Sequence, residues 1–240
     1  MAPTGRDFFK QGWELTRSNA SATATYVALN LATALMPFDP VTGSTGSTIV
    51  DIVAGTALFF LPLWLMTGIA AIGIAAARGL PIPSIFSIDG AVVLKLLAAI
   101  LIEMVLIALG IVLLVVPGLY LMVVWWLTPQ AMVDGAGIYE TLFRKTFRLA
   151  SGSFGLIVAT LSWLSLPMLP LLAIVAAFAL TTGDFTTNPP ALVPEPIATM
   201  LSILASVATV AMMLGSSALY VHLNDRRTEA AAATDLARPA

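Results

Sequence analysis

The sequence predicts an all-α polytopic membrane protein with six transmembrane helices and two amphipathic helices on the cytoplasmic side. Of its 240 residues, 59% are hydrophobic and only 10% are charged, whereas about 25% of residues are charged in a typical water-soluble domain. The apolar residues form continuous runs near the length of about 20 residues that a membrane-spanning helix needs, without the alternation of barrel strands. This composition argues against a soluble enzyme and against a nucleic-acid-binding protein.

Residues 1–19 are expected to form an amphipathic helix that lies in the membrane interface. Their aromatic residues fall on one face at the 3.6-residue period, and their basic residues fall on the other. In such a helix the rings lie among acyl chains and the cations lie at lipid phosphates. We therefore predict a lipid or partner interface made of Phe8, Phe9, Lys10, Trp13 and Arg17.

Residues 20–227 are expected to form a single membrane domain, in which six apolar runs alternate with short connections. Each run is long enough, or nearly so, to cross about 30 Å of hydrocarbon as a helix. The runs cover residues 20–36, 49–77, 91–115, 119–133, 154–181 and 197–223. The remaining residues, 228–240, are short and rich in alanine, and we expect a flexible C-terminal tail.

Prolines predict two interruptions within these runs. The third and fourth runs are expected to pair as a hairpin that turns at Pro117 and Gly118, because proline ends a helix and glycine favours a tight turn. Pro167 and Pro170 lie inside the fifth run, where a proline removes a backbone hydrogen bond. We expect the fifth helix to be kinked there.

A second amphipathic helix is expected at about residues 137–150. Residues 142–149 align with residues 8–15 without gaps at an offset of 134, which suggests a parallel internal repeat of one surface helix and two spans. The alternative is that both surface helices only brace the bundle and fix its orientation. The second lipid or partner interface is predicted to comprise Phe143, Arg144, Lys145, Phe147 and Arg148.

The basic residues predict how the chain is oriented. The 11 Lys and Arg residues fall in the tails, in alternate connections and, for Lys95, at the adjoining end of the third run, and the positive-inside rule assigns all these positions to the cytoplasm. The two long connections of the opposite side, residues 37–48 and 182–194, contain no basic residue. Both termini are therefore expected to be cytoplasmic, and this positively charged face is expected to meet anionic lipid headgroups.

Six segments carry a resemblance to a known family: residues 77–81 with Phe86, the apolar run at residues 110–121, Trp125-Trp126, Asp134-Gly135, the amphipathic stretch at residues 142–153 and residues 220–226. They resemble the six-helix membrane domain of bacterial glycerophosphodiester phosphodiesterases and its uncharacterised, stand-alone YciC-like relatives. The resemblance implies a multi-pass protein of the bacterial inner (plasma) membrane. Nothing in the chain corresponds to the soluble catalytic barrel of those phosphodiesterases, so the resemblance implies no hydrolase activity.

No motif for catalysis, metal binding or cofactor binding is found in the sequence. The chain has no cysteine, and His222 is its single histidine, which excludes thiolate sites and paired histidine ligands. Thr42 to Gly46 form a small, flexible stretch that lacks the lysine of a phosphate-binding loop. We therefore expect no catalytic residue, no metal and no cofactor.

Glu103 is the one ionisable residue that is expected to remain inside the hydrocarbon. It lies about 12 Å deeper than Lys95, which can reach the cytoplasmic interface, and so falls near the middle of the membrane. A charge costs several kcal/mol there, so Glu103 is expected to face the bundle, with Asn30 and Gln130 as hydrogen-bond partners. It is either a proton or cation site of a small carrier, or a neutral structural carboxyl.

Three classes of function remain open. The leading hypothesis is a non-enzymatic inner-membrane protein that acts as an accessory, scaffolding or lipid-interacting subunit, with a membrane-protein partner or a second copy of itself. The alternative is a small transporter or channel that uses Glu103 as an intramembrane proton or cation site. A membrane-embedded enzyme comes third, because it would need several carboxylate, histidine or lysine residues at one depth. No nucleic-acid partner is expected.

Overall fold

The computed structural model of the chain describes residues 3–34, 48–182 and 195–236, and these residues form helices without any strand. The elements are α1 (Gly5–Ser18), α2 (Ala20–Ala34), α3 (Thr48–Ala77), α4 (Gly90–Leu113), α5 (Val115–Trp125), α6 (Thr128–Val133), α7 (Ile138–Glu140), the π-helical turn η1 (Thr141–Lys145), α8 (Thr146–Ala150), α9 (Phe154–Ser165), α10 (Met168–Thr182) and α12 (Glu195–Leu236). The predicted all-α class is confirmed.

Three of the described helices are long and apolar enough to cross a membrane. The qualifying stretches are Phe60–Ala77 of α3, Gly90–Leu113 of α4 and Pro196–Ala232 of α12. The stretches Ile138–Ala150 and Phe154–Ser165 would make a fourth span if they are counted as one, although they are bent by 96°. These helices support the prediction of a membrane protein. Helices α2 and α5, with 15 and 11 residues, are each shorter than a full span.

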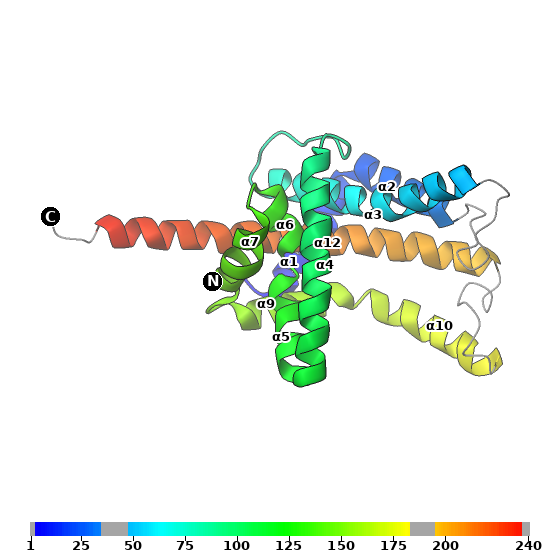
Figure 1. Cartoon of the computed structure of the whole chain (residues 1–240). Coiled ribbons are helices and arrows are strands. Elements are labelled where there is room, and N and C mark those ends of the chain that lie inside the picture. The colour runs from blue at the N-terminus through cyan, green and yellow to red at the C-terminus, as the bar shows by residue number, and fades with distance from the viewer. Residues whose placement is uncertain (1–2, 35–47, 183–194, 237–240) are drawn as a thin grey trace.

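Helix α12 is the central element, and α1, α2, α3 and α9 pack along it. Figure 1 shows that α3, α10 and α12 share one general direction, whereas α4 and α5 run across it as a hairpin. The C-terminal part of α12 extends beyond the other helices (Figure 1). It remains helical to Leu236, so residues 228–236 differ from the flexible tail predicted for residues 228–240.

Helix α1 packs on the bundle through a face that carries two glycines. Gly5, Phe8, Gly12 and Thr16 are buried, and they follow one another at helical spacing. A Cβ atom on Gly12 would lie 2.5 Å from the carbonyl oxygen of Ala211 in α12, so only glycine permits this approach. The helix therefore lies against α12 and α9 at backbone contact distance.

This packing corrects the predicted lipid face of the first amphipathic helix. Phe8 is buried, with its ring centroid 5.5 Å from that of His222, because the glycine face turns toward α12. Lys10, Trp13 and Arg17 are exposed, as an interface with lipid or a partner requires. Phe9 is half-buried beside the ring of Trp163, at 6.3 Å between centroids.

The hairpin of α4 and α5 turns at Leu114, and the turn predicted at Pro117 and Gly118 is wrong by three residues. Leu114 is extended (φ −159°, ψ 119°), and its N–H donates to the carbonyl of Gly110. Pro117 lies in the first turn of α5, where a helix loses no hydrogen bond to proline. Gly118 supports the hairpin, since an added Cβ would lie 2.7 Å from the backbone nitrogen of Ile111.

Two other predicted spans are interrupted. The fourth, residues 119–133, is divided at Trp126 and Leu127 between α5 and α6. The fifth is divided at Leu166 and Pro167 between α9 and α10, which confirms the predicted break at Pro167. Pro170 lies in the first turn of α10 and does not interrupt it.

The second amphipathic segment, predicted at residues 137–150, consists of α7, η1 and α8. Its middle turn is π-helical, and the buried side of the segment carries Thr141, Leu142, Lys145, Thr146, Leu149 and Ala150. Helix α1 has no such turn, so the two segments differ in backbone although their sequences align. The Trp125 indole N–H donates to the carbonyl of Leu142 at 2.8 Å and ties the π-helical turn to α5.

We predict that Gly12→Ala lowers the free energy of unfolding by about 1–3 kcal/mol, because the new methyl group forces α1 away from Ala211 and Gly215. Thermal unfolding in detergent, followed by circular dichroism, measures the change. Gly155→Ala is the matched control, since its Cβ would meet no atom within 4 Å. Equal unfolding temperatures for the two variants would contradict the close contact between α1 and α12.

Candidate functional site

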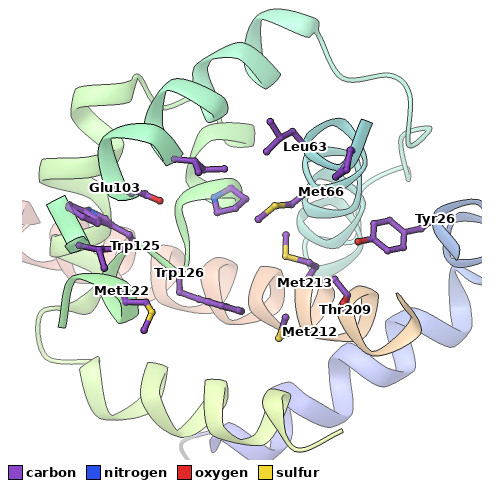
Figure 2. A pocket seen from close by; sticks show the side chains of 14 residues that line it. Tyr26, Leu63, Met66, Glu103, Met122, Trp125, Trp126, Thr209, Met212 and Met213 are labelled. Atoms are coloured by element: carbon purple, nitrogen blue, oxygen red, sulfur yellow. The ribbon is translucent and has the colours of Figure 1, made fainter. Parts of the chain in front are cut away.

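A cavity of about 380 Å³ lies among α2, α3, α4, α5, α6 and α12. Figure 2 shows the 14 side chains that line it. Most are apolar, and the polar ones that reach it are Glu103, Tyr26, Thr209 and the indole of Trp126. Its volume falls within the range of about 300–1,000 Å³ that is usual for small-molecule sites in proteins.

Glu103 reaches the cavity from the buried face of α4. Val93, Leu96, Ala99 and Glu103 are the buried residues of this helix, and their spacing places them along one stripe. The Glu103 Oε1 atom accepts a short hydrogen bond from the hydroxyl of Thr128 at the start of α6. Among the described residues, no donor is bonded to Oε2. One carboxyl oxygen of this cavity-lining side chain therefore has no partner among the described residues.

Trp125 and Trp126, at the end of α5, line the same cavity but offer it no free donor. The indole N–H of Trp125 donates to Leu142, and that of Trp126 donates to the Ser216 hydroxyl of α12, each at 2.8 Å. These bonds hold both indoles in place. What they present to a bound molecule is therefore ring surface.

Methionine side chains and two hydroxyl groups complete the lining of the cavity. The four methionines that line the cavity are Met66, Met122, Met212 and Met213. Their unbranched, polarisable thioethers adapt to ligands of different shape. The hydroxyl of Tyr26 points toward the cavity from the side opposite to Glu103 (Figure 2), and that of Thr209 donates to its own helix at Ala205.

The predicted partners of Glu103 are not its partners in the structure. Asn30 donates to the Tyr26 carbonyl of α2 at 3.2 Å. Gln130 is completely buried in α6, and within the described parts of the chain neither of its amide atoms has a hydrogen-bond partner. Thr128 takes the role expected of Gln130, because it lies two positions earlier at the start of α6. The sequence signal for it was a hydroxyl residue two positions after Trp126.

A second polar cluster surrounds Asp134, at the end of α6. Its Oδ1 atom lies 2.7 Å from Arg78 Nη1, and its Oδ2 atom lies 3.1 Å from Lys145 Nζ. The hydroxyl of Tyr220 donates to Oδ2 at 2.7 Å, and Lys145 Nζ lies 5.3 Å from the centre of the Tyr220 ring. One carboxylate thus connects the end of α3, the π-helical turn and the central helix.

The charge balance of this cluster stabilises the ionised form of Asp134. Burial raises the pKa of the carboxyl, but hydrogen bonds from Arg78, Tyr220 and Lys145 outweigh that effect, and the pKa falls below its ordinary value of 3.8. The same hydrogen bond, set against partial burial, raises the pKa of Arg78. The cluster is therefore a salt bridge with two cations and one anion over the usual pH range.

Lys145 was predicted to face lipid phosphates, and this prediction is corrected by its burial beside Asp134. The π-helical turn directs it inward. Of the other predicted interface residues in this segment, Phe143, Arg144 and Arg148 are exposed. Phe147 is half-buried and meets the Trp125 ring edge-on at 6.2 Å between centroids, so it supports the wall of the cavity.

Comparison with known proteins finds no match to this chain among protein-family models, curated proteins or solved structures. The resemblance to the membrane domain of glycerophosphodiester phosphodiesterases therefore stays a prediction from the segments quoted above. Function has to be inferred from the cavity beside Glu103 and from the cluster around Asp134.

We predict that Asp134→Asn lowers the free energy of unfolding at pH 7 by about 1–3 kcal/mol, since it leaves Lys145 buried without its counter-ion. The lowered pKa of Asp134 also determines the acid response of the wild type. The ionised Asp134 carboxylate stabilises the folded protein above pH 3.8, the ordinary pKa of the group. This stabilisation is lost as the pH falls through the lower pKa of Asp134 in the folded protein.

Chemical unfolding between pH 2 and pH 7 measures both effects, and the difference between wild type and Asp134→Asn is expected to shrink toward the acid end. The matched control is Glu14→Gln, an exposed acid of α1. The cluster would lose its assigned role if Asp134→Asn unfolded like the wild type at pH 7, or if the two proteins differed equally at every pH.

Proposed function

We propose that this chain is a non-enzymatic, lipid-interacting protein of the bacterial inner membrane that binds a lipophilic molecule in the cavity beside Glu103. The observation that carries the proposal is an apolar cavity of about 380 Å³ in whose wall the described residues place one carboxyl group. Such a site excludes most water-soluble metabolites, because their polar groups would lose hydration without gaining partners. A molecule that already resides in the bilayer loses little on entering it.

The walls of the cavity support this assignment. The four methionines offer adaptable contact to a flexible apolar chain. Trp125 and Trp126 add rigid ring surface, because their N–H groups are already bonded within the protein. A single carboxyl among apolar walls would orient an amphiphilic molecule by its polar end.

The proposal includes the topology and partners expected from the sequence. The six proposed spans are α2, α3, α4, α5 with α6, α9 with α10, and α12. They are arranged as a parallel repeat, and both termini are cytoplasmic. The exposed cations of the two amphipathic segments meet anionic headgroups, and a membrane-protein partner or a second copy completes the assembly. These cations are Lys10, Arg17, Arg144 and Arg148.

We predict that Met212→Trp abolishes binding of the co-purifying lipophilic molecule, because the indole fills the space beside Met213 and Thr209. Native mass spectrometry of protein released from membrane-derived nanodiscs measures the bound mass. The wild type is expected to carry a small lipophilic molecule that Met212→Trp lacks.

Met200→Trp is the matched control, since Met200 is an exposed residue of the same helix and lies outside the cavity. It is expected to retain the bound molecule. If the wild type carries none, or if both tryptophan variants retain it, the cavity is not the binding site and the proposal fails. Unfolding temperatures of both variants show whether either one is misfolded.

A second candidate function is a small transporter or channel with Glu103 as its proton or cation site. The observation in its favour is that Glu103 lines the cavity and that one of its carboxyl oxygens has no partner among the described residues. Intramembrane carboxyl groups of this kind serve as proton relays in pumps and transporters.

For this candidate, we predict that proteoliposomes with wild-type protein dissipate an imposed pH gradient, read by an internal pH dye. Glu103→Gln should reduce the rate to that of empty liposomes while its unfolding temperature stays within a few degrees of the wild type. Glu140→Gln, an exposed acid of α7, is the control and should conduct normally. A wild-type rate equal to that of empty liposomes, or an unchanged Glu103→Gln rate, excludes this candidate.

A further inference from the structure

We infer that the molecule bound in this cavity is a lipophilic cation, such as a quaternary ammonium or phosphonium compound, held between the Glu103 carboxylate and the ring faces of Trp125 and Trp126. The inference rests on the proposed function, since it assigns the chemical class of ligand to the same cavity. The charge of the cavity wall, its aromatic surface and the number of its oxygen atoms each restrict the class of ligand, and all three favour an organic cation.

The first restriction is charge. Among the described residues, Glu103 is the one carboxylic acid in the wall, and no lysine, arginine or histidine lines the cavity with it. The two cations of the Asp134 cluster, Arg78 and Lys145, are both paired with Asp134. An anionic lipid head would meet a carboxyl without a counter-ion, which is costly in a low-dielectric site. A monovalent cation paired with the ionised carboxylate makes the filled cavity neutral.

The second restriction is the aromatic surface. Trp125 and Trp126 line the same cavity as Glu103, and tryptophan is the side chain that attracts a cation most strongly through its ring face. Because the two indole N–H groups are bonded to Leu142 and Ser216, neither is available to a polar ligand. Ring faces beside a carboxylate are the arrangement that recognises a cation with apolar substituents.

The third restriction is the number of oxygen atoms. A small metal cation needs about six or more oxygen ligands, or several retained waters, in the manner of calcium and magnesium. Glu103, Tyr26 and Thr209 are the oxygen-bearing side chains in the wall, and one oxygen of Glu103 already accepts from Thr128. A bulky organic cation has no such need, because its apolar substituents contact the methionines and the isoleucines of α4.

We predict that purified wild-type protein in detergent binds tetraphenylphosphonium in equilibrium dialysis, after subtraction of the uptake by empty micelles. Glu103→Gln should weaken the affinity by about tenfold or more, because the neutral amide removes the counter-charge. Glu140→Gln should bind as the wild type does. Trp126→Leu should weaken binding severalfold, whereas Trp126→Phe, which keeps a ring face, should stay close to the wild type.

Two further probes separate the inference from the proposed function. Tetraphenylborate has a similar shape but a negative charge, and it should not bind; triphenylmethanol is a neutral lipophile of comparable size. If triphenylmethanol binds in a manner that Met212→Trp abolishes while tetraphenylphosphonium does not bind, the cation inference is wrong and the proposed function stands. If no probe binds in a manner sensitive to Met212→Trp, both fail. Equal affinity of the wild type and Glu103→Gln for tetraphenylphosphonium also overturns the inference.

Discussion

A carboxyl group removed from water must find a cation or a hydrogen-bond donor, and this requirement organises both polar sites of the protein. Asp134 finds Arg78, Lys145 and Tyr220, and its bonds hold the end of α3, the π-helical turn and α12 together. Glu103 finds only the hydroxyl of Thr128 among the described residues. Both oxygens of Asp134 are thus bonded within the protein, whereas one oxygen of Glu103 remains able to interact with a bound molecule.

The frame that carries these acids depends on backbone contact between helices. Gly12 of α1 meets α12 at Ala211, and Gly73 of α3 meets α12 at Ser217, where an added Cβ would lie 2.6 Å from the serine side chain. Without an extensive hydrophobic driving force inside a membrane, close approach of small residues is a main source of helix association. Helices α1 and α3 therefore both approach α12 at backbone contact distance.

The cavity lies where this tight packing gives way to the hairpin of α4 and α5. The hairpin runs across α3 and α12, and large side chains fill only part of the space between them (Figures 1 and 2). Thr128 and the Trp126–Ser216 hydrogen bond attach the hairpin at two points without closing the space. The cavity therefore arises where the hairpin crosses α3 and α12. Its walls combine apolar side chains, the two hydrogen-bonded indoles and the Glu103 carboxyl group.

The composition and the apolar runs were sufficient to predict a helical membrane protein, the extents of α3 and α4, the break at Pro167 and the isolation of Glu103, since each depends on local sequence. Local sequence was insufficient for the burial of Phe8 and Lys145, for the turn at Leu114 and for the pairing of Glu103 with Thr128. The partners of Asp134 illustrate the reason, because Arg78 and Tyr220 lie 56 and 86 residues away along the chain. Hydropathy places a helix in the membrane, but only the packing of distant helices determines which side chain meets a buried charge and where space for a ligand remains.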